Sequence, residues 1–556
     1  MINFLQSNFS AHSRRKIYLI FAFISLILLI ISIRQIYPVM IEVNDPLGLA
    51  SHLTASYWIG LALMILVSIT AFLDRDLNHD VIFLILLISL GLFLFGIGVF
   101  AYENARIPDV YYPISEVNLV LTNHHIDIAS PESLFTNLYY SWPVVHFISA
   151  SLLSITGIGL TFVKYVPLFY ILMIILITYS IGQRLEMKPN RCFLLSFLVL
   201  SSWQIMYHYA PNALGAMLYL VIMIFLIFWK STKANISIII LLLGTLAMTH
   251  GLSLLATAAG LVILAIYKRK TIFIVITALF ILGFAGWMMY AARQAVGISL
   301  TALLDFPLFH LRQATEMARY TLPSATARAV ARYAQLSYVA IWGIPVIISV
   351  VLLLRRRITG KLRQQVLPFI FFAIGPALLV FLNYGQMLYR VYVFCLIPVV
   401  CIIVLSLAGR RLARVLMIVL ICVLPFINLL ATYAVDVSWP QVLTTELRGG
   451  RFFALEVEPK PTDKYFCPNY NPVFYYNSKW QEAHISIPPD INEKIDISFL
   501  DKQNYVILSR QASNTMNFER GEDLYSTWPQ TEAGEKTDLI YDNGSYQIYR
   551  NRLDKP

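Results

Sequence analysis

Long apolar runs alternate with short polar loops along residues 1–434 of the chain. A helix needs about 20 apolar residues to cross the hydrocarbon core of a bilayer. The stretch 236–267 is long for one such span and short for two. The pattern predicts an all-α polytopic membrane protein with about thirteen transmembrane helices, at residues 17–33, 54–73, 81–101, 160–181, 192–209, 213–229, 236–248, 252–267, 271–290, 336–354, 366–383, 391–408 and 415–433.

Beyond residue 434 the apolar runs become short and alternate with polar turns, as in Tyr505–Leu508. Asn543-Gly544 lies between two such runs, a pattern typical of a β-hairpin. We therefore expect a small α/β or mainly β soluble domain at 435–556. It would follow N-terminal transmembrane helices at 1–80 and a membrane module at 81–434.

The composition excludes a soluble or disordered protein. Of the 556 residues 58% are apolar and only 13% are charged, whereas soluble domains carry about 25% charged residues. The net charge of +11 divides into +16 for residues 1–434 (29 basic, 13 acidic) and −5 for residues 435–556 (13 basic, 18 acidic). The basic excess belongs to the membrane part, so we expect no nucleic-acid partner.

The basic residues give the predicted orientation. Short loops rich in Lys and Arg face the cytoplasm, which places the N-terminus inside, and the loops 102–159 and 293–335 and the tail outside. The predicted location is a multi-pass cell membrane protein with an extracytoplasmic C-terminal domain. The loops that fix this orientation contain residues 14–16, 75, 184–191, 230–233, 268–270, 355–363 and 410–414.

The outer loop 102–159 holds the most informative polar residues. Asp109 precedes Pro113, and the following residues 114–123 have apolar side chains at helical spacing, which predicts a short amphipathic helix in the membrane interface. Glu116 lies seven residues beyond Asp109, a spacing that would put both carboxylates on one side of a continuous helix. A second apolar helix is expected to follow Trp142-Pro143.

This pattern resembles the GT-C superfamily of membrane glycosyltransferases, which includes protein O-mannosyltransferases, the aminoarabinose transferase that acts on lipid A, and oligosaccharyltransferases. The resemblance covers roughly residues 81–434. It is carried by Asp109 in the long outer loop, the Trp142-Pro143 step, the short turns 207–212 and 249–251, and Arg390 before an apolar run. The tail contains no Trp-Trp-Asp motif, which counts against an oligosaccharyltransferase.

The resemblance implies a sugar donor carried on polyprenyl phosphate or diphosphate and an inverting displacement at its anomeric carbon. The acceptor would be a protein, a lipid or a glycan. Asp109 is the expected general base, with Glu116 as a second carboxylate, while Arg390 and His250 would bind the donor phosphate. Three runs precede the acidic loop where many relatives have one, so Asp45 is an alternative catalytic carboxylate.

The sequence predicts no cofactor. It contains no GxxxxGK[ST], GxGxxG, HExxH or CxxC pattern, which removes the usual evidence for a nucleotide enzyme or a zinc site. His124, His125 and Asp127 could bind a divalent metal, but such a spacing on a loop is common, and no metal site is predicted. A transporter or flippase, a polysaccharide polymerase or ligase, and a non-enzymatic assembly subunit are the alternative functions.

Overall fold

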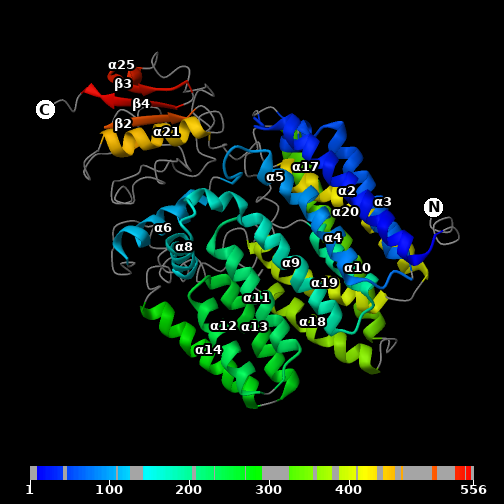
Figure 1. Cartoon of the computed structure of the whole chain (residues 1–556). Coiled ribbons are helices and arrows are strands. Elements are labelled where there is room, and N and C mark those ends of the chain that lie inside the picture. Colours follow the sequence, from blue (N-terminus) through cyan, green and yellow to red (C-terminus); the bar gives the residue numbers. More distant parts are fainter. Residues whose placement is uncertain are drawn as a thin grey trace.

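A computed structural model of the chain describes residues 9–41, 45, 47–74, 76–107, 110–124, 142–202, 208–230, 232–269, 271–290, 325–354, 360–378, 387–407, 411–434, 443–457, 465–466, 504–509, 532–544 and 546–552. Helices dominate, and a small sheet forms from the last part of the chain (Figure 1).

Each of the thirteen predicted runs contains a helix. The third is continuous through a π-helical turn, η2 (Leu92–Gly96), and the stretch 236–267 forms two helices that meet at Met248–His250. The helices are α2 (Ala11–Ile36), α3 (Ala55–Leu73), α4 (Asp80–Gly91) with α5 (Ile97–Phe100), α9 (Val166–Arg184), α10 (Pro189–Leu200), α11 (Pro211–Ile227), α12 (Lys233–Ala247), α13 (Gly251–Lys268), α14 (Thr271–Tyr290), α17 (Ala325–Leu354), α18 (Gly360–Leu378), α19 (Met387–Leu407) and α20 (Arg411–Tyr433).

Seven helices among the described residues are long and apolar enough to cross a membrane. Several others, including α10 and α12, are shorter, so the count of thirteen spans stays a prediction. The seven are Ala11–Ile36, Ala55–Leu73, Asp80–Phe100, Thr161–Arg184, Thr271–Tyr290, Tyr333–Leu352 and Arg414–Tyr433.

Helix α2 shows why these helices belong in lipid. Its buried stripe includes Ala22, Ser25 and Ser32, whereas Ile20 and Phe23 on the opposite side are 56% and 64% exposed. Small residues let neighbouring helices approach closely, and lipid tails accept the large apolar side chains outside. A soluble helix would show the reverse pattern.

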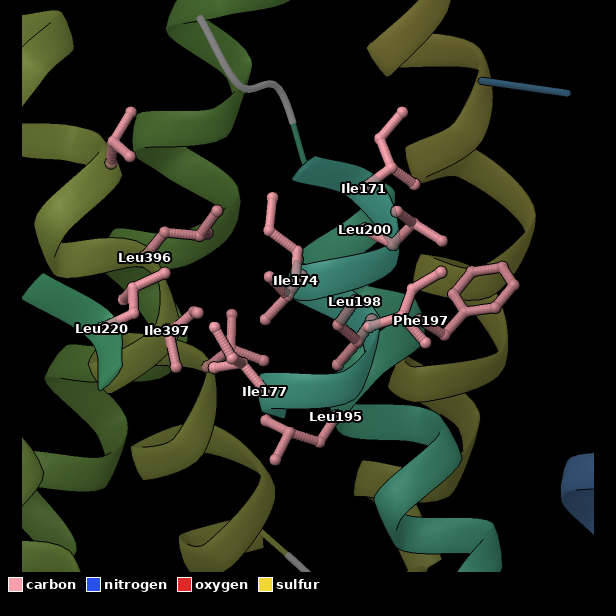
Figure 2. Close-up of a cluster of buried hydrophobic side chains, with 14 of the residues drawn as sticks. Ile171, Ile174, Ile177, Leu195, Phe197, Leu198, Leu200, Leu220, Leu396 and Ile397 are labelled. Carbon is pink, nitrogen blue, oxygen red and sulfur yellow. The ribbon is translucent and has the colours of Figure 1, made fainter. Parts of the chain in front are cut away.

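The interior between the helices is apolar. Figure 2 shows isoleucine and leucine side chains of α9, α10, α11 and α19 filling the space between these four helices. Leu195, Phe197 and Leu198 are inaccessible to solvent. A core of this kind holds the bundle rigid and supports the loops at its two ends.

The contacts between the connecting segments show which of these segments lie at the same end of the helical bundle. At one end, called the basic end, Lys361 pairs with Glu186, Asn190 donates to the Phe72 carbonyl, and Tyr179 donates to Asp80. The turns there are those that the positive-inside rule placed in the cytoplasm. The opposite end carries two short helices, α6 (Tyr111–Asn123) and α8 (Val144–Thr156), and is called the α6 end.

Both short helices were expected from the sequence. Helix α6 begins at Tyr111, which puts Pro113 in its first turn, where proline is tolerated. Helix α8 begins after Pro143 and ends at Gly157, which takes a left-handed conformation with φ of 67°. The two helices pack on each other through an apolar cluster that includes Ile114 and Val145.

The last part of the chain forms a four-stranded sheet in the order β1-β2-β4-β3, with β1 (Tyr465–Phe466) parallel to β2 (Tyr505–Ser509) and the other pairs antiparallel. Strands β3 (Thr537–Asp542) and β4 (Tyr546–Asn551) form the hairpin predicted at Asn543-Gly544, and Gly544 has the positive φ of 84° that such a turn requires. The helices α21 (Thr444–Phe452) and α25 (Glu532–Glu535) accompany the sheet (Figure 1).

Candidate functional site

Four segments singled out in the sequence meet at the α6 end. The indole of Trp142 lies against Gly251, where an added Cβ would be 2.9 Å from the ring. The Tyr209 hydroxyl lies 2.8 Å from Ser149 Oγ on α8, and helix α8 packs on α6. The turns at 208–211 and 249–251, the Trp-Pro step and the amphipathic helix therefore form one assembly.

A narrow recess opens beside this assembly. It contains about 370 Å³ of empty space, including its open mouth, between α5, η4 (Leu160–Tyr165) and the segment that precedes α6. Three of its lining residues are basic, and none of the described lining residues carries a carboxylate. The basic residues are Arg106, Lys164 and His208.

A backbone carbonyl and an aromatic ring orient Arg106. Its Nη2 donates to the carbonyl of Thr432 at the end of α20, and its guanidinium lies 4.5 Å from the centre of the Tyr433 ring. Tyr433 is itself fixed because its hydroxyl donates to the Leu94 carbonyl at 2.8 Å. The carbonyl and the aromatic face together fix the direction of the guanidinium.

Lys164 is also held by backbone carbonyls, and the Glu103 carboxylate interacts with its charge. Its Nζ donates to the carbonyls of Tyr102 at 2.7 Å and Glu103 at 3.1 Å. Among the described residues these two acceptors take two of its three N–H groups, which leaves one for a ligand. Lys164 and Arg106 therefore present positive charge to one recess.

Buried acidic and basic side chains also concentrate at this end. Glu116 on α6 is 1% exposed, His146 on α8 is 0% exposed, and His208 is 7% exposed. Burying such groups is costly, and their concentration in one place is typical of functional sites. In the described part of the chain the other buried acids and bases are Arg14, Asp74 and Glu446.

Two predicted site residues contact neighbouring groups in their own loops. Asp45 Oδ2 lies 2.8 Å from His52 Nε2 in the loop between α2 and α3. His250 is the N-cap of α13, where its Nδ1 accepts from the Ser253 backbone N–H at 3.3 Å. The capping interaction gives His250 a structural function, and its predicted contact with the donor phosphate stays a prediction.

The remaining predictions fall partly outside the described residues. Asp109, His125 and Asp127 lie outside them, and Arg390 is described only as a backbone position in α19. Within the described part of the chain, no group of three or more His, Cys, Asp or Glu side chains could hold a metal ion. The catalytic and phosphate-binding assignments therefore stay predictions.

Sequence reasoning missed Arg106 and Lys164. A signal for Arg106 exists, because it stands three residues before Asp109 in the same loop. Lys164 gives no comparable signal, since it stands in an apolar run where lysine is also expected as an interfacial residue whose ammonium reaches the headgroups. Only the fold brings the two cations to one recess.

Fold and site define a polytopic helical membrane protein with a small sheet domain and a basic recess at its α6 end. No family model and no curated protein sequence matches the chain. Among solved structures it is similar to the archaeal oligosaccharyltransferase AglB from Archaeoglobus fulgidus, determined in complex with an inhibitory peptide and a dolichol-phosphate. The TM-score is 0.49 and the identity 12%, over 86% of this chain and 75% of that one. A likeness at this level assigns no activity, so the residues of this chain have to carry the functional interpretation.

Proposed function

We propose that the protein transfers a sugar from a polyprenyl phosphate or diphosphate carrier to an acceptor at the extracytoplasmic face of the membrane. The single observation that carries the proposal is the recess lined by Arg106, Lys164 and His208 at the α6 end. The basic end would face the cytoplasm, because its loops hold most of the short-loop Lys and Arg. The recess would then open on the outer side.

The chemistry requires stabilisation of a leaving phosphate. The acceptor nucleophile forms a new bond to the anomeric carbon while the bond from that carbon to the phosphate oxygen breaks, and the phosphate leaves on its carrier with an additional negative charge. Cations fixed in advance stabilise that charge without reorganising. Arg106 and Lys164 would be these cations here. Arg390 stays a further candidate for binding the same phosphate.

A carboxylate must take the proton of the acceptor. Asp109 is the first choice, since it lies three residues beyond Arg106 in the loop that enters α6. Glu116 is buried on α6 itself and is the second. No cofactor enters this mechanism.

An apolar groove offers a place for the isoprenoid chain of the carrier. It contains about 1050 Å³ of empty space, open mouth included, between α17 and α20, and Tyr333, Ile427 and Leu430 line it. Leu430 lies two residues before Thr432, whose carbonyl holds Arg106, which is about 3 Å along the helix axis. Residues two positions apart face different sides of a helix, so an isoprenoid chain in the groove would have to pass around α20 to reach a phosphate at Arg106.

The test is sugar transfer from radiolabelled polyprenyl phosphate sugars in membranes that contain the protein. The Asp109→Asn variant should lose transfer by at least about 100-fold, as expected when a general base is removed. Asp45→Asn is the matched control, because it removes a carboxylate from another loop at the same end, and it should retain transfer. Undiminished transfer in Asp109→Asn would refute the assignment of the base, and a loss only in Asp45→Asn would move the site to the loop between α2 and α3.

A further inference from the structure

Glu103 connects two parts of the molecule that differ in chemistry. Its backbone carbonyl accepts from Lys164 Nζ at 3.1 Å, and its side-chain Oε2 accepts from the backbone N–H of Thr444 at 3.2 Å. Thr444 is the first residue of α21, and an N–H at a helix start favours a carboxylate partner. A single residue therefore contacts both a cation of the recess and the first helix of the C-terminal domain.

Helix α21 is in turn fixed to the sheet. Asn543 in the hairpin donates to the Thr445 carbonyl at 2.7 Å, and Phe452 stacks on Tyr541 with ring centres 4.6 Å apart. The ring of Tyr546 of β4 packs so closely on Gly449 that a Cβ at this position would clash with it. The position of α21 is consequently set by the C-terminal domain.

The segment 101–106 has no helix or strand to hold it, so its anchors decide where its carbonyls lie. Val39 N–H donates to the Ala101 carbonyl at 2.9 Å at one end, and Arg106 donates to the Thr432 carbonyl at the other. Between these two points, Glu103 and the contact of Asn104 Nδ2 with Thr444 Oγ1 at 3.4 Å tie the segment to α21. The acceptors of Lys164, the carbonyls of Tyr102 and Glu103, lie in this part.

We propose that Glu103 is a positioning residue through which the C-terminal domain sets the geometry of the Lys164–Arg106 recess. The hydrogen bond from Thr444 to Glu103 fixes the segment whose carbonyls hold Lys164. Breaking that bond lets the lysine and its charge shift away from the ligand. The inference rests on the proposed function for the identity of the ligand as a lipid-linked phosphate.

Four variants separate the hydrogen bond from other effects. Glu103→Ala removes the acceptor, whereas Glu103→Gln keeps a carbonyl oxygen in its place. Thr444→Pro removes the donor N–H at the first helical position, where proline is well tolerated, and Leu443 before it already has the extended conformation (φ −82°, ψ 154°) that proline favours. Thr444→Val keeps the N–H and loses only the hydroxyl that Asn104 contacts.

The measurement is the binding of farnesyl phosphate to the purified full-length protein in nanodiscs, together with hydrogen exchange of the peptide that contains residues 101–107. Glu103→Ala and Thr444→Pro should each weaken binding about fivefold, the size expected for one lost hydrogen bond, and should speed exchange in that peptide. The double variant should be no weaker than either single variant, because both remove the same bond. Thr444→Val should stay near the wild type. Glu103→Gln should bind no more weakly than the wild type, because it keeps the acceptor oxygen and removes a negative charge beside Lys164.

Contradictory results are equally clear. Additive losses in the double variant, or equal losses in Glu103→Ala and Glu103→Gln, would overturn the positioning by this bond. Unchanged binding in Glu103→Ala would do the same, provided that the thermal unfolding temperature matches the wild type. If the wild type binds no farnesyl phosphate, the proposed ligand is wrong, while faster exchange at 101–107 in Thr444→Pro but not in Thr444→Val would still report the mechanical link.

Discussion

The basic side chains at the two ends of the helical bundle contact different groups. At the basic end Arg14 is 4% exposed and donates to Asp74 through Nε at 2.9 Å and to Asp76 at 2.9 Å. At the α6 end Arg106 and Lys164 bond to neutral carbonyls and lie beside a recess. Arg14 is buried against carboxylates and joins two segments of the fold, whereas Arg106 and Lys164 line a recess that a ligand could enter.

Asp74 shows the structural function of the charges at the basic end in more detail. Asp74 accepts from Arg14 and also from the Tyr18 hydroxyl at 3.0 Å, and it is 2% exposed. Its oxygens are used to join α2 to the turn after α3.

The largest effect is expected at the basic end. Arg14→Ala would leave Asp74 buried without its cation, and removing one partner of a buried ion pair costs about 3–5 kcal/mol of unfolding free energy. Denaturant titration in detergent micelles measures it. Replacing both residues, as in Arg14→Leu with Asp74→Leu, should cost less than Arg14→Ala alone, and a larger cost for the double variant would contradict this account of the pair.

At the α6 end the largest expected loss is in activity. Arg106→Ala should lower sugar transfer about 10²–10³-fold, as expected when a fixed donor to developing charge is removed. Arg106→Lys should recover part of it, because a lysine keeps the charge but cannot stack on Tyr433 in the same way. The assay is transfer of radiolabelled sugar per folded molecule, and equal rates in all three proteins would remove Arg106 from the site.

Lys164→Gln should have a smaller effect on transfer. The loss of one charge-assisted contact corresponds to about 1.5 kcal/mol, or about tenfold. The loss should appear in the KM for the lipid-linked donor if the contact exists before the reaction, and in kcat if it forms only in the transition state. Lys361→Gln at the basic end is the matched control, since it removes the same charge from an exposed pair, and it should change neither constant by more than about twofold.

The smallest effect is expected for an exposed ion pair. Lys361 and Glu186 at the basic end are 68% and 73% exposed, and exposed pairs contribute about 0–1 kcal/mol. Lys361→Ala should therefore change neither the unfolding free energy beyond that range nor the transfer rate. A large loss of stability or of transfer would mean that exposed charges in this protein contribute as much as buried ones.

Much of the fold follows from the sequence, because lipid imposes simple rules. The thirteen apolar runs all contain helices, and the short helices after Asp109 and Trp142-Pro143 lie where the periodicity and the proline positions put them. The hairpin at Asn543-Gly544 is also confirmed. It could be predicted because only a few residue pairs suit such a turn. The helices and the hairpin depend on residues that are close to one another in the sequence.

The site could be predicted only in part. Helical periodicity places Glu116 on α6, but it does not show that Arg106 contacts Thr432 or that Lys164 contacts Tyr102, since these contacts join residues 326 and 62 positions apart. The link between Glu103 and α21 spans 341 positions. Such pairings depend on how the helices pack, which a hydropathy pattern leaves open.

The most direct test of the α6 end as the donor site is photo-crosslinking with a polyprenyl phosphate that carries a diazirine beside its phosphate. Mass spectrometry would locate the labelled peptides in the full-length protein in membranes, with unlabelled polyprenyl phosphate as competitor. Labelling that the competitor suppresses should fall within residues 101–111 and 160–166. Suppressible labelling confined to residues 74–80 and 184–191 at the basic end would contradict the proposed site.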